Sequence, residues 1–153
     1  MMNKALMILV ISAVITGCIP VSHKVAQQNP SQNDLERLQG TWTQESEVID
    51  GQRQPEEIVK TKITYSGHKW IVKNGNQIIM EGSSEFWPDK EPKEIDILPT
   101  SGPGAGTVLP GIYRLRGDTY ESCFVLPGKE RPKDFSSETN TGSFHDVFKR
   151  EKL

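Results

Sequence analysis

Residues 69–79 have the sequence KWIVKNGNQII, in which two apolar runs flank Asn74-Gly75-Asn76. An Asn-Gly pair between two such runs is a strong signal of a β-hairpin, because these residues tolerate the positive φ angles of a tight turn. A further run, 62–66, precedes this stretch across the turn signal Gly67-His68. Two hairpins in succession predict an antiparallel meander, since parallel strands would need a long crossover between them.

Short runs of the same character continue on both sides of this stretch. They span residues 41–48, 77–86, 94–98, 108–116, 119–125 and 144–150. About eight strands are therefore expected, together with one short N-terminal helix over residues 35–39, capped by Asn33 or Asp34. A meander of this kind leaves exposed edges unless its first and last strands pair. The pattern predicts an all-β fold, a small antiparallel up-and-down β-barrel of about eight strands.

The first eighteen residues differ in character from the rest of the chain. One positive charge, Lys4, precedes an apolar run that is too short to cross a bilayer and that ends in Ile15-Thr16-Gly17-Cys18. The tetrad resembles the lipobox of bacterial lipoproteins, which implies cleavage before Cys18 and acylation of that cysteine. The alternative is an ordinary signal peptide or a weak membrane anchor with an incidental cysteine. Ile19 is not the aspartate that retains many lipoproteins at the inner membrane, so the resemblance favours the outer membrane.

The expected organisation has three parts: a signal peptide at 1–17, a lipidated N-terminus and flexible tether at 18–33, and one β-barrel domain at 34–153. The tether is rich in Gln, Asn, Ser and Pro and has little apolar surface with which to form a core. Without residues 1–17 the chain keeps 17 basic against 20 acidic side chains. No nucleic-acid partner is expected, because such an acidic domain lacks the basic surface that phosphate backbones require.

A series of short motifs runs through residues 34–151: DLERLQGTW at 34–42, IDILP at 95–99, GPG at 102–104, GIY at 111–113, GDT at 117–119, Cys123-Phe124, Pro127-Gly128, Arg131-Pro132, Phe135 and FKRE at 148–151. Taken in this order, these motifs resemble the lipocalin-like domain family that recurs in planctomycete exported proteins. This resemblance implies a lipocalin-type barrel and brings no established activity.

Gly40-Thr41-Trp42 is also similar to the Gly-x-Trp signature on the first strand of lipocalins. The resemblance implies that Gly40 lets the chain turn into the barrel and that Trp42 plugs the closed end beneath a basic side chain of the last strand. Arg150 or Lys149 is the expected basic partner. Gly40, Trp42 and Arg150 are therefore predicted to form a structural barrel floor rather than a ligand site.

Three aromatic residues and one arginine are candidates for ligand contact. Tyr113, Tyr120 and Phe124 would line a cavity if the barrel has one, although strand alternation would direct some of them outward. Arg131 lies in the proline-rich segment 127–135. That segment either packs over the barrel with Phe135 as its anchor, which is the favoured alternative, or offers Arg131 to an anionic group.

Signals for catalysis, metals and cofactors are weak. His23, His68 and His145 share no spacing that would place them on one metal, and no cofactor is expected. Ser143, His145 and Asp146 could suggest a hydrolase, but neighbouring residues of a strand face opposite sides of the sheet. The loop 102–106 lacks the Lys-Ser/Thr ending of a phosphate loop. Cys123, the one thiol left once Cys18 is acylated, is expected to be a buried apolar residue that forms no disulfide.

The sequence leaves three functions open. The first is a non-enzymatic, lipid-anchored protein that binds a small apolar or amphipathic ligand, or an envelope protein. The second is a structural or protein-interaction module with a filled barrel, and the third is an envelope hydrolase. A barrel of about eight strands can hold one small ligand or be filled by its own side chains, so the presence of a cavity discriminates between the first two.

Overall fold

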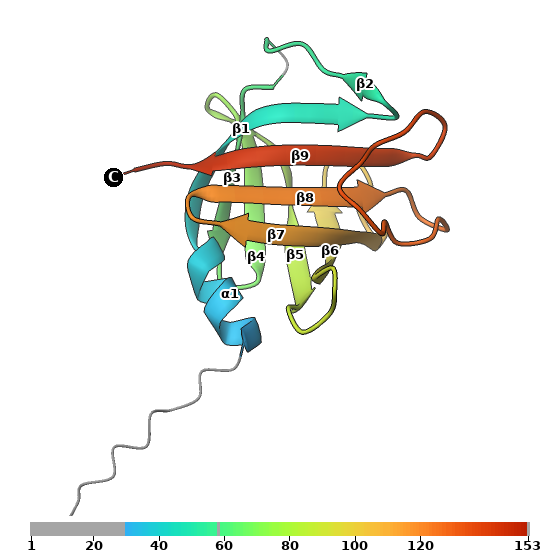
Figure 1. The fold of residues 1–153 in the computed structure, drawn as a ribbon. Coiled ribbons are helices and arrows are strands. Elements are labelled where there is room, and N and C mark those ends of the chain that lie inside the picture. The colour runs from blue at the N-terminus through green and yellow to red at the C-terminus, as the bar shows by residue number, and fades with distance from the viewer. Residues whose placement is uncertain (1–29, 58, 153) are drawn as a thin grey trace, which may run out of the picture.

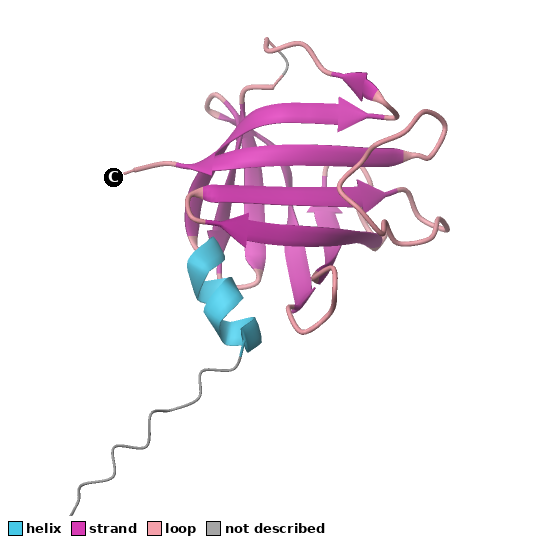
Figure 2. Ribbon diagram, in the orientation of Figure 1, coloured by secondary structure: helices cyan, strands magenta, loops and turns pink. Residues whose placement is uncertain are grey.

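The computed structural model describes residues 30–57 and 59–152. The predicted signal peptide, Cys18 and the tether up to residue 29 lie outside the described residues. Figure 2 shows that strands dominate the described part and that a single helix lies beside them. None of the helices described is long and apolar enough to cross a membrane.

In the described part of the chain nine strands follow the helix, all antiparallel to their neighbours. Tight turns join most of them, among them the predicted turns at Gly67-His68, Gly75-Asn76 and Gly117-Asp118. The strands are β1 (Gly40–Ile49), β2 (Gln52–Arg53), β3 (Thr61–Ser66), β4 (Lys69–Asn74), β5 (Gln77–Trp87), β6 (Glu94–Ser101), β7 (Leu109–Arg116), β8 (Thr119–Val125) and β9 (Ser143–Arg150).

The sheet closes on itself through β1. This strand pairs with β3 on one side and with β9 on the other, so eight strands form a closed barrel and the two-residue strand β2 is an extra at the end of β1. Figure 1 shows β1, β9, β8 and β7 on one side of the barrel and β3 to β6 on the other. The predicted antiparallel barrel of about eight strands is confirmed.

Strand β1 is bound unequally to its two neighbours. Its pairing with β3 involves only Gly40 to Thr43, whereas its pairing with β9 runs from Trp42 to Ile49. Beyond Thr43 the backbones of β1 and β3 therefore separate, and the barrel widens toward the end where β2 lies. A β-bulge between Gln44 and Ser46 adds a residue to β1 and changes which of its later side chains face inward.

The helix α1 (Pro30–Leu38) closes the opposite end of the barrel. Leu38 is fully buried, and the Gln39 side chain exchanges two hydrogen bonds with the backbone of Gly67 in the β3–β4 turn. The predicted first residue of this helix was wrong. The helix begins at Pro30 rather than at residue 35, so Pro30 to Asn33 belong to α1 and not to the tether, and Asp34 lies within the helix rather than at its cap. Proline is well suited to a first helical position because the amide hydrogen it lacks would be unpaired there.

Segment 126–142 covers the outer face of β7 and β8, and Figure 1 shows it crossing in front of these strands. Phe135 packs beneath Arg114, whose guanidinium lies 4.2 Å from the ring centroid, and beside His145. Cys123 faces outward from the barrel, yet it is buried under this segment and its thiol donates to the carbonyl oxygen of Ser136. Burial is the main cause that raises the pKa of Cys123 to about 12, so this thiol remains protonated and unreactive.

Candidate functional site

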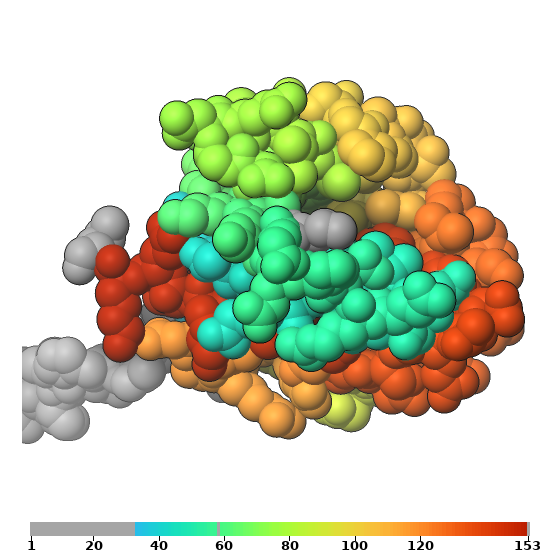
Figure 3. Space-filling model, turned by 90° about the horizontal axis from the view of Figure 1, so that it is seen from above, coloured from blue at the N-terminus to red at the C-terminus, as the bar shows by residue number. Residues whose placement is uncertain are grey.

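A cavity of about 330 Å³ lies inside the barrel. Viewed from above, the molecular surface is hollowed between the lime-green β4–β5 segment and the turquoise β1–β2 segment (Figure 3). The cavity is lined by sixteen side chains: Gln44, Glu47, Thr61, Ile63, Tyr65, Trp70, Val72, Asn74, Ile79, Met80, Ile97, Tyr120, Ser122, Phe124, Asp146 and Phe148.

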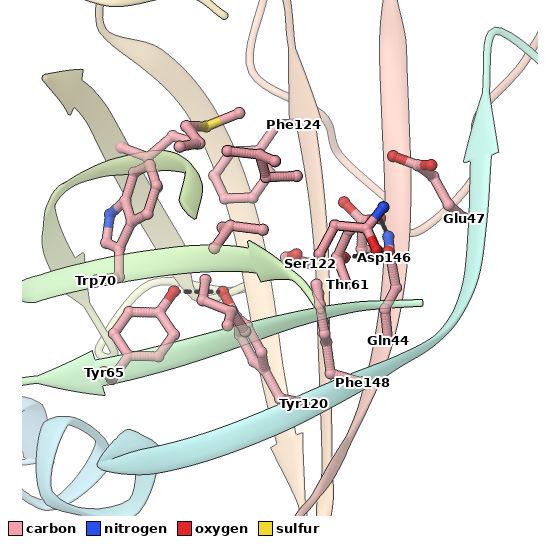
Figure 4. A pocket seen from close by; sticks show the side chains of 16 residues that line it. Gln44, Glu47, Thr61, Tyr65, Trp70, Tyr120, Ser122, Phe124, Asp146 and Phe148 are labelled. Carbon is pink, nitrogen blue, oxygen red and sulfur yellow. Dashed lines mark hydrogen bonds between the residues drawn. The ribbon is translucent and has the colours of Figure 1, made fainter. Parts of the chain in front are cut away.

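One side of the cavity is apolar. Trp70 and Phe124 lie together there (Figure 4), because the inward positions of β4 and β8 carry large apolar residues, and Met80 of β5 also lines the cavity. Tyr65 and Tyr120 lie below them, with their hydroxyl oxygens 3.2 Å apart. The two phenols serve as each other's hydrogen-bond partner, so this part of the wall presents mainly ring surface to a ligand.

The other side of the cavity is polar and centres on Asp146 of β9. Its carboxylate is 8% exposed and accepts a hydrogen bond of 2.7 Å from the amide nitrogen of Gln44. The Gln44 amide oxygen in turn accepts one of 2.5 Å from the Thr61 hydroxyl. This chain of contacts spans the region where the backbones of β1 and β3 have separated, so side chains replace the missing backbone pairing there.

The β-bulge brings a second carboxyl group to the same side. Strand alternation from the buried Trp42 and Gln44 would direct Ser46 inward, but the bulge pairs Glu47 rather than Ser46 with Asp146. Glu47 is half-buried, and Figure 4 shows its side chain beside Asp146 at the cavity rim. The polar side of the cavity therefore carries two acidic groups.

These two groups have altered acidity. Burial, and to a lesser extent the negative charge of Glu47, raises the pKa of Asp146 to about 7, although the Gln44 amide opposes the shift. Burial also raises the pKa of Glu47 above its ordinary value. Asp146 thus changes its charge near neutral pH, where a carboxylic acid on a protein surface would be fully ionised.

The structure separates the four residues that the sequence suggested for ligand contact. Tyr120 and Phe124 line the cavity. Tyr113 is buried at the helix end of the barrel, where its hydroxyl donates to Asp34, and it does not line the cavity. Arg131 also lies away from the cavity: its guanidinium donates to the carbonyl oxygens of Ile95 and Gly111 and pairs with Glu94 and Asp96 on the outer face.

The residues suggested for the barrel floor lie together. The guanidinium of Arg150 lies 4.0 Å from the ring centroid of Trp42 and donates to the carbonyl oxygens of Gln39 and Arg37 at the end of α1. Trp42 is fully buried, and its indole donates to Leu38. Gly40 has a φ of 99°, a left-handed conformation that favours glycine, where the chain passes from helix to strand.

Sequence reasoning did not identify Gln44, Glu47 or Asp146 as candidate ligand contacts. Asp146 was considered only as part of a hydrolase arrangement with Ser143 and His145. In the structure His145 contacts Glu121 and Asp146 faces the cavity, on the other side of the sheet. Strand alternation could have placed Gln44 inside, two residues after Trp42. Glu47 carried no such signal, because nothing local in the sequence marks the bulge.

Among residues 30–57 and 59–152, no cluster of three or more His, Cys, Asp or Glu side chains is arranged to hold a metal ion. No family model, curated protein or solved structure matches this chain. The barrel and its cavity are therefore the features of the protein that bear on its function.

Proposed function

We propose that this protein is a non-enzymatic, lipid-anchored cell-envelope protein of lipocalin-like fold that binds one small apolar or amphipathic ligand inside its barrel. The observation that carries this proposal is the cavity between the β1–β2 and β4–β5 segments. Its volume of about 330 Å³ falls within the range of small-molecule sites in proteins. A barrel serving only as a structural module would be expected to fill this space with its own side chains.

The distribution of polarity supports the same proposal. Most lining residues are apolar or aromatic, and the few polar ones are gathered on one side. Binding sites for small molecules typically combine an apolar wall with a few placed polar groups that fix orientation.

A cavity-filling substitution tests the binding proposal. The neutral fluorescent probe N-phenyl-1-naphthylamine should bind to the full chain carrying Cys18→Ser, which removes acyl chains that could themselves occupy the barrel. Val72→Trp should abolish probe binding, because the larger side chain occupies the cavity that Val72 lines.

The matched control is Ile71→Trp, which places the same side chain on the other face of strand β4 and should leave probe binding unchanged. Circular dichroism establishes that both variants are folded. Absence of probe binding to the parent chain, or equal binding by both tryptophan variants, would contradict the proposal.

The anchoring part of the proposal rests on the sequence around Cys18 and is tested separately. Cells expressing the unaltered chain should carry it in the membrane fraction, whereas Cys18→Ser should release it to a soluble fraction. Density separation of the two membranes should place the unaltered protein in the outer membrane, as Ile19 suggests. A Cys18→Ser variant that stays with the membranes would refute acylation as the anchor.

A further inference from the structure

The polar side of the cavity contains a buried acid that the protein itself pairs incompletely. Asp146 is more than nine-tenths buried, and the Gln44 amide donates to only one of its oxygens, Oδ1. Its other oxygen, Oδ2, accepts no hydrogen bond from any side chain in the described part of the protein. Burial of a carboxylate is costly unless the group is fully hydrogen-bonded or paired with a cation.

The contacts around Asp146 exclude compensation by a neighbouring cation. The described residues that line the cavity include no lysine, arginine or histidine. The Thr61 hydroxyl donates to the oxygen of the Gln44 amide, so that the amide nitrogen faces Asp146 and the amide oxygen faces Thr61. Glu47 adds a second acid on the same side. A group that satisfies this end of the cavity must therefore donate hydrogen bonds and, most favourably, carry positive charge.

The opposite side of the cavity constrains the rest of the ligand. Trp70 and Phe124 present apolar surface there, across the cavity from Asp146 (Figure 4), and Met80 is a further apolar lining residue. A purely polar cation would leave this surface in contact with water, and a purely apolar molecule would leave the acid unpaired. Only a molecule that has both a cationic group and an apolar part matches the polar and the apolar side of the cavity.

We propose that the ligand is a cationic amphiphile, an alkyl or aryl amine whose ammonium group is held by Asp146 and Glu47 while its apolar part packs against Trp70, Met80 and Phe124. This inference rests on the proposed function, since it names the class of molecule that the barrel takes. It excludes fatty acids and other anionic amphiphiles, because a carboxylate head group would lie against two acids.

The titration of Asp146 makes binding of such a ligand depend on pH. The groups facing Asp146 are Gln44 and Glu47 on β1, Thr61 on β3, and Ser122 and Tyr120 on β8, and Glu47 is the other acid among them. The raised pKa of Asp146, about 7, means that the empty cavity holds a neutral acid below neutral pH. An ammonium group favours the ionised form, so affinity should rise as pH increases from 5.5 to 8.

Displacement of N-phenyl-1-naphthylamine tests the proposal with three competitors that share one chain length: octylamine, octanol and octanoate. With the full chain carrying Cys18→Ser at pH 8, octylamine should displace the probe at a concentration about tenfold lower than octanol, the expected gain from a charge-assisted hydrogen bond. Octanoate should be the weakest of the three. At pH 5.5 the advantage of octylamine over octanol should shrink.

Asp146→Asn removes the charge and keeps the shape of the side chain. This variant should still bind the probe, but the advantage of octylamine over octanol should fall to about twofold or less. The matched control is Glu45→Gln, which makes the same change of charge at an exposed position of β1 outside the cavity and should keep the full advantage.

The outcomes separate this inference from the proposed function. Probe binding followed by equal displacement by octylamine and octanoate, or a preference for octanoate, overturns the inference and leaves a barrel that binds apolar molecules. An unchanged octylamine advantage in Asp146→Asn also overturns it. Failure of the probe to bind to the parent chain overturns the proposed function together with the inference.

Discussion

Two aspartates are buried inside the barrel, one at each end, and their surroundings differ. Asp34, in α1 at the closed end, is 3% exposed and contacts a phenol and two cations: the Tyr113 hydroxyl at 2.8 Å, the Lys93 ammonium at 2.6 Å and the Arg37 guanidinium at 3.4 Å. Asp146, in β9 near the open end, is 8% exposed and has one neutral partner. The same residue type is thus fully compensated at one end and incompletely at the other.

This difference separates the structural role of Asp34 from the binding role proposed for Asp146. Asp34 connects α1 to β7 and to Lys93 in the loop before β6, so its charge helps to hold the helix over the closed end. The Asp146 carboxylate contacts the neutral Gln44 amide of the adjacent strand β1, has no ion pair among the described residues, and lies beside a cavity. An acid that is buried without compensation lowers stability, and such groups gather at functional sites, where a ligand can supply the missing partner.

The largest effect is expected when the compensated acid is removed. Asp34→Ala should lower the free energy of unfolding by about 3 kcal/mol, because Lys93 and Tyr113 lose a partner in a largely buried place. Denaturation with urea measures the loss. Glu36→Ala, an exposed position on the same helix, is the control and should stay within about 0.5 kcal/mol of the parent. Equal effects of the two substitutions would show that Asp34 does not hold the helix.

Removal of the incompletely paired acid, Asp146, should raise the free energy of unfolding rather than lower it. The folded state raises the pKa of Asp146 above the value it has when unfolded, so stability from this group is present at low pH and is lost as pH rises from about 4 to about 7. Asp146→Asn should therefore match the parent near pH 4 and exceed its stability by about 2 kcal/mol at pH 8. Thermal and urea unfolding across this pH range provide the measurement. A variant less stable than the parent at pH 8 would contradict the incomplete pairing.

The smallest effect concerns the repulsion between the two acids of the cavity. Glu47→Gln removes the negative charge that helps to raise the pKa of Asp146, so that pKa should fall from about 7 toward the ordinary range. Stability at pH 8 should rise by about 0.5 kcal/mol, as expected for a partly exposed pair. Carbon-detected NMR titration of the Asp146 carboxyl follows the pKa directly. The substitution Glu45→Gln, at an exposed position, should leave the pKa of Asp146 unchanged.

The closed barrel was predictable because its signals are local. Asn74-Gly75 and Gly117-Asp118 define hairpins by their own conformational preferences, and alternation within each run assigns the faces. The resemblance of Gly40-Thr41-Trp42 to the lipocalin signature implied that Trp42 would lie beneath Arg150 or Lys149 of the last strand, and Arg150 is the residue found there. The start of α1 at Pro30 was missed because polar residues that can form a helix also have the composition of a tether.

The acid pair in the cavity was less predictable, since it depends on contacts between distant segments. Asp146 lies among polar residues, and only the pairing of β9 with β1 shows that it faces Gln44 across the interior. The cavity depends on the separation of β1 from β3 after Thr43, and no short sequence motif indicates this separation. Tyr113 shows the same limit, because its hydroxyl is directed toward Asp34, far away in the sequence.

The β-bulge between Gln44 and Ser46 has a consequence for how the interior of this barrel can change. A single residue inserted in one strand reverses the alternation of every residue after it, without altering the strand pairing before it. Regular pairing of the same sequence, with Glu45 opposite Val147, would bring Ser46 to the inside and turn Glu47 outward, whereas deletion of Glu45 would leave Glu47 opposite Asp146. The charge beside the cavity therefore depends on the bulge in β1 as much as on the composition of that strand, because regular pairing would place the neutral side chain of Ser46 opposite Asp146.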